Sequence, residues 1–254
     1  MTPPDWTCSA PLFLDGPHGR IAYRREPGAG PGLVWLGGFK SDMTGTKAAF
    51  LADWARLRGR AFLRFDYSGH GESEGAFEDG CISAWLADAL AAFDALTEGP
   101  QILIGSSMGG WIAALLALQR SARVAGIVFI APAPDFTEEL IWRDMDEAAR
   151  ARLMREGRIE APPDYSDEPT IITRSLIEDG RRHLILGGPI AIRCPVRILQ
   201  GMADADVPWR HALRLAEAID GGDVEITLVK AGDHRLSSPA DLDRLGATLE
   251  RLSD

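Results

Sequence analysis

A Gly-x-Ser-x-Gly pentapeptide at residues 105–109 constrains the fold of this chain more than any other feature. The apolar run 102–104 before it is typical of a buried strand, and the alanine- and leucine-rich run 111–118 after it favours a helix. Glycines at both ends of the pentapeptide allow a strand and a helix to meet in a sharp turn, because a Cβ atom would collide there. The pattern therefore predicts a strand–turn–helix elbow with the Ser107 side chain at its tip.

A serine hydroxyl at such an elbow becomes a nucleophile when a histidine and a carboxylate lie within reach. In folds with this elbow, both residues follow the serine along the chain, the acid first. An acidic loop that contains Asp204 follows one apolar run, and His234 follows the next. Both positions come at the ends of expected strands, where parallel sheets place their chemistry. We therefore predict that Ser107, Asp204 and His234 form a catalytic triad.

The choice of the acid rests on spacing. Asp204 and Asp206 lie two residues apart on one loop, and the spacing Gly-x-x-Asp-x-x-Val-Pro of residues 201–208 favours Asp204. Asp206 is interpreted as a solvated or loop-capping carboxylate. Asp233 adjoins the histidine and is interpreted as a turn residue.

The order of the residues also separates His234 from the other histidines of the chain. These four precede the serine or fall in segments with a helical pattern, so we interpret them as surface or structural residues. They are His18, His70, His183 and His211. The segment 66–73 contains an acid, a histidine and serines that suggest a second site, but its glycine spacing favours a structural turn.

An oxyanion hole needs two backbone N–H donors near the serine. In elbows of this kind one donor belongs to the residue after the nucleophile, here Met108, and the other to the turn after an earlier strand. That turn is expected at residues 37–39, where paired glycines let the backbone approach an oxygen closely. Phe39 and Met108 are therefore the predicted oxyanion donors.

Short apolar runs alternate with helical patterns along most of the chain, which predicts an α/β fold with a mostly parallel sheet and helices on both faces. The expected strands cover residues 21–25, 32–36, 61–65, 102–105, 126–130, 196–200 and 225–229. The expected helices cover residues 46–58, 82–96, 110–119, 211–219 and 239–252. We predict an α/β core of residues 1–133 and 190–254, with a small helical cap of residues 134–189 inserted in it.

The cap is expected to fold as a lid over Ser107. Its helical patterns cover residues 138–142, 145–156 and 170–179. Apolar side chains there either line an acyl pocket or pack the cap onto the core, and they include Ile141, Trp142, Leu153, Met154 and Ile171. Trp142 and Trp209 are the candidate substrate-binding residues. No metal-ligand spacing occurs in the sequence, and we expect neither a metal nor a cofactor.

Composition limits the partners that this chain is expected to have. A chain of 254 residues with 46% hydrophobic content can bury one large core. The formal net charge of −10 argues against a nucleic acid or an anionic membrane surface as partner. Three widely separated cysteines argue against a disulfide framework and for a reducing compartment; they are Cys8, Cys81 and Cys194.

Targeting and membrane signals are also expected to be absent. The longest apolar run is far shorter than the roughly 20 residues that span a bilayer. Residues 1–11 show neither a secretory signal nor the arginine-rich pattern of a mitochondrial presequence. We therefore expect no membrane span and a cytoplasmic location. The sequence does not indicate whether the chain is a monomer or an oligomer.

These motifs resemble those of the α/β-hydrolases, and within that superfamily the chain is similar to the mitochondrial palmitoyl-protein thioesterase and acyl-glucuronide esterase subgroup of animals. The matching stretches extend over nearly the whole chain and include residues 45–48, 64–69, 99–103, 105–111, 201–202, 207–209 and 233–235. The resemblance implies Ser107, Asp204 and His234 as the triad, and palmitoyl-type thioesters or acyl glucuronides as substrates. The cap segment matches least well.

The sequence thus predicts a serine hydrolase that cleaves carboxylic esters or thioesters through an acyl-enzyme. Its substrate is expected to be a small-molecule ester or thioester or an acylated protein. Alternatives with the same triad are a cofactor-independent perhydrolase and a carbon–carbon bond hydrolase, and a third alternative is a slow-turnover ligand-binding receptor on the same fold. A haloalkane dehalogenase is disfavoured because its nucleophile is an aspartate.

Overall fold

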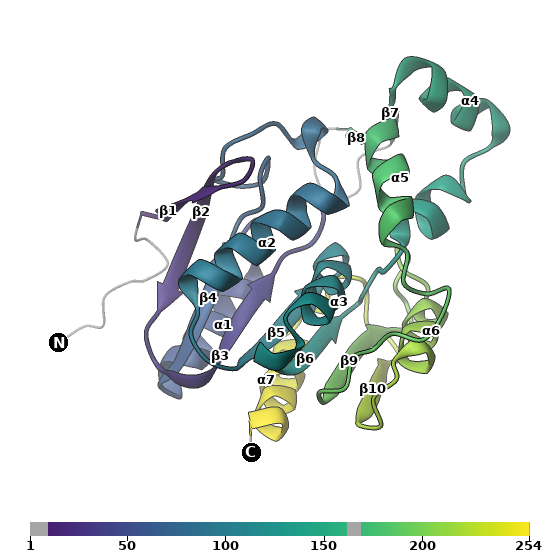
Figure 1. The fold of residues 1–254 in the computed structure, drawn as a ribbon. Helices are drawn as coiled ribbons and strands as arrows, with labels where there is room; N and C mark the ends of the chain where they lie inside the picture. Colours follow the sequence, from purple (N-terminus) through teal and green to yellow (C-terminus); the bar gives the residue numbers. More distant parts are fainter. Residues whose placement is uncertain (1–9, 162–168, 254) are drawn as a thin grey trace.

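A sheet of eight strands forms the centre of the molecule (Figure 1). The computed structural model describes residues 10–161 and 169–253. In spatial order the strands are β1 (Leu12–Gly16), β2 (Gly19–Glu26), β4 (Arg60–Phe65), β3 (Ala29–Leu36), β5 (Gln101–Ser106), β6 (Val124–Ile130), β9 (Val196–Gly201) and β10 (Val224–Val229). The pairs β1–β2 and β2–β4 are antiparallel, and all other neighbours in this sheet are parallel.

Helices cover both faces of the sheet (Figure 1). They are α1 (Thr46–Leu57), α2 (Ile82–Leu96), α3 (Met108–Gln119), α6 (Trp209–Ala218) and α7 (Pro239–Ser253), with short 3₁₀ turns at η1 (Phe77–Asp79) and η2 (Ser121–Arg123). Trp54 of α1 and Leu249 of α7 pack on one face, whereas Trp85 of α2, Trp111 of α3 and Leu215 of α6 pack on the other. Because both faces are covered, a central strand such as β5 is buried along its whole length.

The predicted strands and core helices all occur, with bounds within three residues of those expected. The parallel α/β fold is therefore confirmed. The central sheet also contains one strand, β1, that the sequence pattern did not predict. It is an edge strand, and its Leu12 and Phe13 side chains are 58% and 44% exposed, so it lacks the buried face that gives a strand a readable pattern.

The cap rises from the body of the protein between β6 and β9 (Figure 1). Its elements are the π-helix η3 (Thr137–Trp142), α4 (Glu147–Glu156), the strands β7 (Arg158–Ala161) and β8 (Thr170–Thr173), α5 (Arg174–Gly180) and the 3₁₀ turn η4 (Arg181–His183). The helix expected over residues 170–179 was wrong in its first four residues, because Thr170–Thr173 pairs antiparallel with β7. Threonine and isoleucine are β-branched and fit a strand well.

Hydrogen bonds to buried carboxylates fix the cap on the core. Asp135, near the start of the cap, accepts hydrogen bonds of 2.9 Å from the backbone N–H groups of both Ile185 and Leu186, near its end. Asp179 of α5 accepts hydrogen bonds from the backbone N–H (2.8 Å) and the hydroxyl (2.7 Å) of Ser83, at the start of α2. These contacts close the base of the cap and tie it to a core helix.

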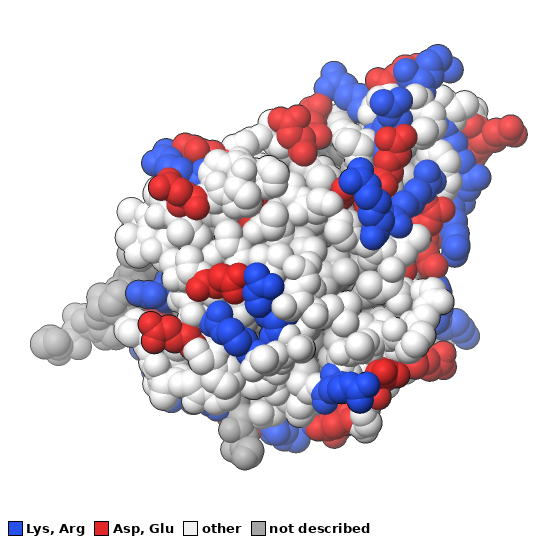
Figure 2. All heavy atoms as spheres, in the orientation of Figure 1, with Lys and Arg blue, Asp and Glu red and all other residues white. Residues whose placement is uncertain are grey.

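Within the described residues, no helix has the length and apolar character needed to cross a membrane. Acidic and basic side chains are intermingled over the cap (Figure 2), in ion pairs such as Arg181 with Glu138 at 2.7 Å. Cys81 and Cys194 are free thiols. Cys8 and the rest of residues 1–9, on which the expectations about targeting rest, lie outside the described residues.

Candidate active site

Ser107 lies at the turn between β5 and α3, with a φ of +54° and a ψ of −120°. A positive φ is uncommon for a residue that has a side chain. The neighbouring glycines explain how the chain reaches this turn: a Cβ atom at Gly109 would lie 2.0 Å from the carbonyl oxygen of Leu36, and one at Gly105 would lie 2.4 Å from that of Gly109. The elbow therefore depends on these glycines and presents the serine at the carboxyl end of β5.

His234, in the loop after β10, lies between Ser107 and Asp204, which is in the loop after β9. The Nε2 atom of His234 is 3.1 Å from the Ser107 hydroxyl oxygen, and its Nδ1 atom is 2.9 Å from Oδ2 of Asp204. The structure thus brings together the three residues that the sequence singled out. An imidazole with its proton on Nδ1 donates to Asp204 and accepts from the serine in this geometry.

The side chain of Asp204 is fully buried. Its Oδ1 accepts hydrogen bonds from the backbone N–H groups of Asp206 (2.9 Å) and Val207 (2.8 Å), and its Oδ2 also accepts one from the Gln200 side chain (2.9 Å). Burial alone raises the pKa of Asp204, but the hydrogen bonds from His234 and these donors outweigh it and lower the pKa below its usual value. Asp204 therefore carries a negative charge beside the imidazole.

The two other carboxylates near the site, Asp206 and Asp233, have different roles from that of Asp204. Asp206 is exposed, and its backbone N–H supports Asp204. Asp233 accepts a hydrogen bond of 2.9 Å from the backbone N–H of Leu236, as a turn residue does. The carboxylate of Asp204 is thus the one that contacts His234.

Three of the other histidines contact groups elsewhere in the protein. Nε2 of His211 lies 2.6 Å from the carbonyl oxygen of Pro134, where the cap leaves the core. Nε2 of His183 lies 2.7 Å from the Ser83 hydroxyl, at the base of the cap. His70 is buried beneath the loop that follows β3. The contacts of His211 and His183 are those of structural residues.

Residues 37–45, named the oxyanion loop below, follow β3 and pass beside the serine. A Cβ atom at Gly38 would lie 3.4 Å from Cβ of Ser107, which is van der Waals contact. In the part of the chain that the structure describes, the backbone N–H groups of Phe39 and Met108 donate no hydrogen bond to another protein group. Both amides are therefore available to an oxygen atom bound at Ser107.

Two cavities meet at the serine, and both are lined by Phe39, Ser107, Thr170 and His234. The larger, about 560 Å³, lies under the cap. Its apolar lining comes mainly from Phe136, Leu140, Ile141, Met145, Ala149, Ile159 and Ile172, and it is also bordered by the charged residues Asp144, Arg152, Glu160 and Asp206. The smaller, about 330 Å³, is called the polar cavity below because charged and polar side chains border it, among them Lys40, Ser41, Asp42, Lys47 and Arg235. An apolar cavity of this volume suits an acyl chain.

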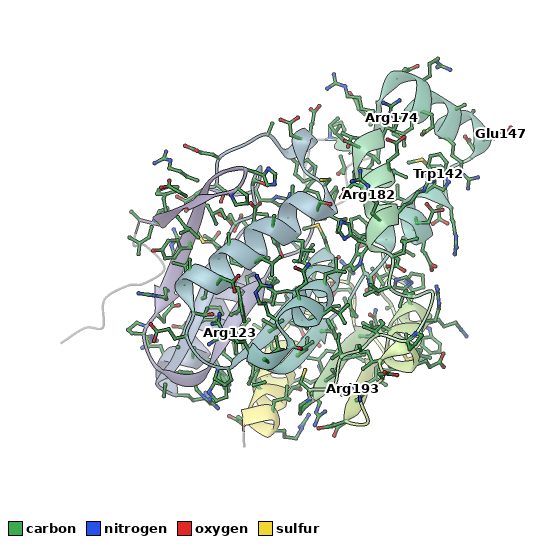
Figure 3. All side chains as sticks on the ribbon, viewed as in Figure 1. Arg123, Trp142, Glu147, Arg174, Arg182 and Arg193 are labelled. Carbon is green, nitrogen blue, oxygen red and sulfur yellow. The ribbon has the colours of Figure 1, made fainter. Side chains whose placement is uncertain are left out.

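The structure does not bring Trp142 and Trp209 to either cavity. Trp142 lies on the cap (Figure 3), where the guanidinium groups of Arg150 and Arg181 lie 5.4 and 4.6 Å from its ring. Trp209 begins α6, and the guanidinium of Arg210 stacks 4.3 Å from its ring. These contacts are cation–π interactions.

Lys47 is a candidate that the sequence reasoning missed. From the first turn of α1 its ammonium donates a hydrogen bond to the carbonyl oxygen of Arg235 and lies 3.4 Å from the Ser237 hydroxyl. It thereby holds the loop that carries His234. Burial lowers the pKa of Lys47 to about 8. The signal in the sequence is that Lys47, one of only three lysines in the chain, occurs in residues 45–48, a stretch that carries the family resemblance.

Among the described residues, Asp204, Asp206 and His234 have donor atoms within 4.8 Å of one another, which is close enough to hold a metal ion. Both oxygens of Asp204 already accept hydrogen bonds, and both ring nitrogens of His234 have partners. This arrangement is suited to proton transfer and leaves few lone pairs for coordination.

The sheet, the elbow and the position of the cap define an α/β-hydrolase, and comparison with known proteins gives the same class. The model of a family described as serine aminopeptidase, S33, matches residues 34–174. The mitochondrial palmitoyl-protein thioesterase ABHD10 of Bos taurus is 37% identical over 244 residues, which are 95% of this chain and 79% of the bovine protein. The Homo sapiens protein of the same name is 35% identical over the same shares.

Solved structures agree. A candidate hydrolase from Agrobacterium vitis S4 has 47% identity and a TM-score of 0.92, with 96% of this chain and 98% of that one covered. The α/β-hydrolase domain-containing protein 10 from mouse has 35% identity and a TM-score of 0.89, over the same shares. The chain therefore belongs to the α/β-hydrolases and, within them, to the family of ABHD10. The curated relatives are named as mitochondrial proteins, so the comparisons do not support the cytoplasmic location expected from the sequence.

Proposed function

We propose that this protein hydrolyses carboxylic esters and thioesters through a covalent acyl-enzyme on Ser107. One observation carries the proposal: the serine hydroxyl lies 3.1 Å from Nε2 of His234, at the junction of an apolar and a polar cavity. The family relationship supports the reaction class, because relatives at 35% and 37% identity are named palmitoyl-protein thioesterases.

In the first step His234 takes the proton of Ser107 while the serine oxygen attacks the carbonyl carbon of the substrate. The carbonyl oxygen becomes an oxyanion and accepts hydrogen bonds from the backbone N–H groups of Phe39 and Met108. Asp204 stabilises the imidazolium. When the tetrahedral intermediate collapses, the carbon–oxygen or carbon–sulfur bond breaks, and His234 returns the proton to the leaving alcohol or thiol.

In the second step water takes the place of the leaving group. His234 accepts a proton from this water, whose oxygen attacks the acyl carbon, and the same two N–H groups hold the second oxyanion. The bond to Ser107 then breaks, the serine regains its proton from His234, and the carboxylic acid is released. A thiolate leaves readily because its conjugate thiol has a pKa of about 8.5, so one site serves esters and thioesters.

The two cavities bind different parts of the substrate. The cavity under the cap, with its apolar lining from η3, α4, β7 and β8, takes the acyl chain, and the polar cavity takes the leaving group. The thioesterase names of the relatives, which refer to a palmitoyl group, support a long chain in the apolar cavity. Each methylene group that moves from water into it contributes up to about 0.8 kcal/mol.

The test is a series of p-nitrophenyl esters and acyl thioesters from acetyl to palmitoyl. We expect kcat/KM to rise up to about tenfold for each two added carbons and to level off where the cavity ends. A flat profile would show that the cap cavity does not bind the acyl chain. Absence of turnover with every ester and thioester would contradict the reaction itself.

A further inference from the structure

The loop after β4 is hydrogen-bonded to the oxyanion loop. Residues 66–75, named the brace loop here, follow β4, the strand that pairs with β3 in parallel. Two hydrogen bonds join the loops: the backbone N–H of Lys40 donates to Nε2 of His70 at 3.2 Å, and that of Met43 donates to Oδ1 of Asp66 at 2.6 Å. The brace loop therefore accepts hydrogen bonds from two amides of the oxyanion loop.

The contact with His70 occurs where the oxyanion loop adopts an unusual conformation. Lys40 has a φ of +57°, which is uncommon for a residue with a side chain. Its amide comes directly after Phe39, whose backbone N–H faces the serine site in the proposed mechanism. A hydrogen bond that fixes the Lys40 amide therefore also fixes the peptide plane next to the Phe39 donor.

The surroundings of His70 decide its protonation. The residue is 4% exposed, and its ring lies edge-on to Tyr67, Phe77 and Trp85, with ring centroids 5.2 to 5.7 Å away. Burial in this aromatic cage lowers the pKa of His70 to about 4. The ring is therefore neutral at neutral pH, and a neutral ring has one donor nitrogen and one acceptor nitrogen.

The partners of His70 assign these two roles. Nδ1 lies 3.2 Å from the carbonyl oxygen of Ser68, which only accepts, so Nδ1 carries the proton. Nε2 faces the Lys40 N–H, which only donates, so Nε2 is the unprotonated acceptor. The same aromatic cage holds the Phe39 ring, whose centroid lies 4.8 Å from that of Phe77. Both the backbone and the side chain next to the oxyanion donor are thus held by one cluster.

We propose that His70 is a positioning residue: its Nε2 fixes the Lys40 amide and thereby holds the Phe39 N–H where the oxyanion forms. The proposal rests on the proposed function, because it assigns His70 a part in the same reaction without contact with substrate. It predicts a loss in the step that forms the oxyanion and not in substrate binding. A residue that only stabilises the fold has no such selective effect.

The first test compares two substitutions. His70→Phe fills the space but offers no acceptor to the Lys40 N–H. We expect kcat for a medium-chain ester to fall about 10- to 100-fold, because a small displacement of a catalytic group lowers the rate strongly. KM should change less than about twofold. His70→Gln places an acceptor oxygen near the former Nε2 and is expected to recover most of the rate. The same two substitutions at His18, which is exposed in the turn between β1 and β2, are the matched controls and should have no effect.

The second test does not depend on activity. Nitrogen-15 NMR of the wild-type protein near pH 7.5, with the His70 signal identified by its loss in His70→Gln, is expected to show a neutral ring with the proton on Nδ1. A proton on Nε2, or a protonated ring at this pH, would overturn the proposal even if the variants fail to fold. Folded His70→Phe protein with wild-type kcat, or with equal losses in kcat and affinity that His70→Gln does not restore, would also overturn it.

The two tests separate this proposal from the proposed function. If the wild-type protein turns over no ester or thioester, the proposed function fails and the catalytic role of His70 fails with it. If the wild-type protein is active and His70→Phe matches it, the positioning role alone fails. The expected support is an active wild-type enzyme, a kcat defect in His70→Phe, recovery in His70→Gln and the Nδ1-protonated ring.

Discussion

The Nε2 atom of His234 lies 3.1 Å from the hydroxyl oxygen of Ser107, although the two residues are 127 positions apart in the chain. The elbow after β5 and the loop after β10 bring them together, since the carboxyl ends of parallel strands share one edge of a sheet. The serine needs a base at this distance to lose its proton during attack.

The hydrogen bonds of Asp204 predict different effects for two neighbouring substitutions. Asp204→Asn removes the charge beside His234 and favours the wrong imidazole tautomer, so kcat should fall by about 10⁴, as in other serine hydrolases that lose this acid. Asp206→Asn leaves the backbone N–H that supports Asp204 in place, and kcat should stay within about threefold of the wild type. Steady-state kinetics on both variants is the measurement. A larger loss at Asp206 would contradict the assignment of the acid.

The close approach of Gly109 to Leu36 predicts an effect on stability. In Gly109→Ala the new methyl group would lie 2.0 Å from a backbone oxygen, and only a shift of the main chain relieves this contact. We expect the free energy of unfolding to fall by about 3 kcal/mol or more, and activity to be lost with the elbow. Gly222→Ala is the control, because nothing lies within 4 Å of its added methyl group. Urea titrations that give equal midpoints for the two variants would count against this account of the elbow.

Much of the fold was predictable from local patterns. The glycines of residues 105–109 specify the elbow because only a residue without a Cβ atom fits against Leu36, and this requirement is visible in the sequence. The central strands were predictable because burial on both faces makes them continuously apolar. The sequence predicts a helix at β8 because the helical pattern of α5 directly follows it. The strand forms because it pairs with β7, and this tertiary contact leaves no local pattern.

The parts of the site that were not predicted depend on contacts between distant segments. The hydrogen bond from Lys40 to His70 joins two loops 30 residues apart, and no local pattern marks His70 as an acceptor for that amide. The size and apolar character of Trp142 predict a substrate contact, but its ring lies near two arginine side chains of the cap. Side-chain direction at such positions follows from packing, which sequence periodicity does not record.

The lining of the cap cavity predicts how acyl-chain preference changes. Ala149 of α4 lines this cavity, whereas its neighbour Ala148 is exposed. Ala149→Phe should fill part of the cavity and lower kcat/KM for the palmitoyl substrate by about tenfold or more, with acetyl-ester hydrolysis changed less than about twofold. Ala148→Phe adds the same side chain outside the cavity and should leave the profile unchanged. Identical chain-length profiles for both variants would argue that the acyl chain binds elsewhere.

The burial of His70 predicts a pH-dependent contribution to stability. Folding lowers the pKa of His70 from 6.5 to about 4. Between pH 4 and pH 6.5 this histidine is therefore protonated in the unfolded chain and neutral in the folded protein. The contribution of the neutral ring is therefore fully present above pH 6.5 and is lost as the pH falls toward 4, by about 3 kcal/mol in total.

The difference in unfolding free energy between the wild type and His70→Gln isolates this effect. It is needed because Asp66, whose pKa is raised by burial to about 6, titrates in the same range with the opposite sign. We expect the advantage of the wild type to grow as the pH rises from 4.5 to 7. Denaturant titrations that show a constant difference across this range would mean that His70 titrates normally in the folded protein.

The central claim, that Ser107 is a nucleophile activated by His234, is tested most directly by covalent trapping. A fluorophosphonate reacts with an activated serine and leaves a stable phosphonyl group, so intact-protein mass spectrometry followed by peptide mapping identifies the labelled residue. We predict one adduct, on Ser107, in the wild type, none in Ser107→Ala with unchanged circular dichroism, and strongly slowed labelling in His234→Ala. An unlabelled wild-type protein, or Ser107→Ala protein that is labelled and turns over esters as the wild type does, would contradict the account.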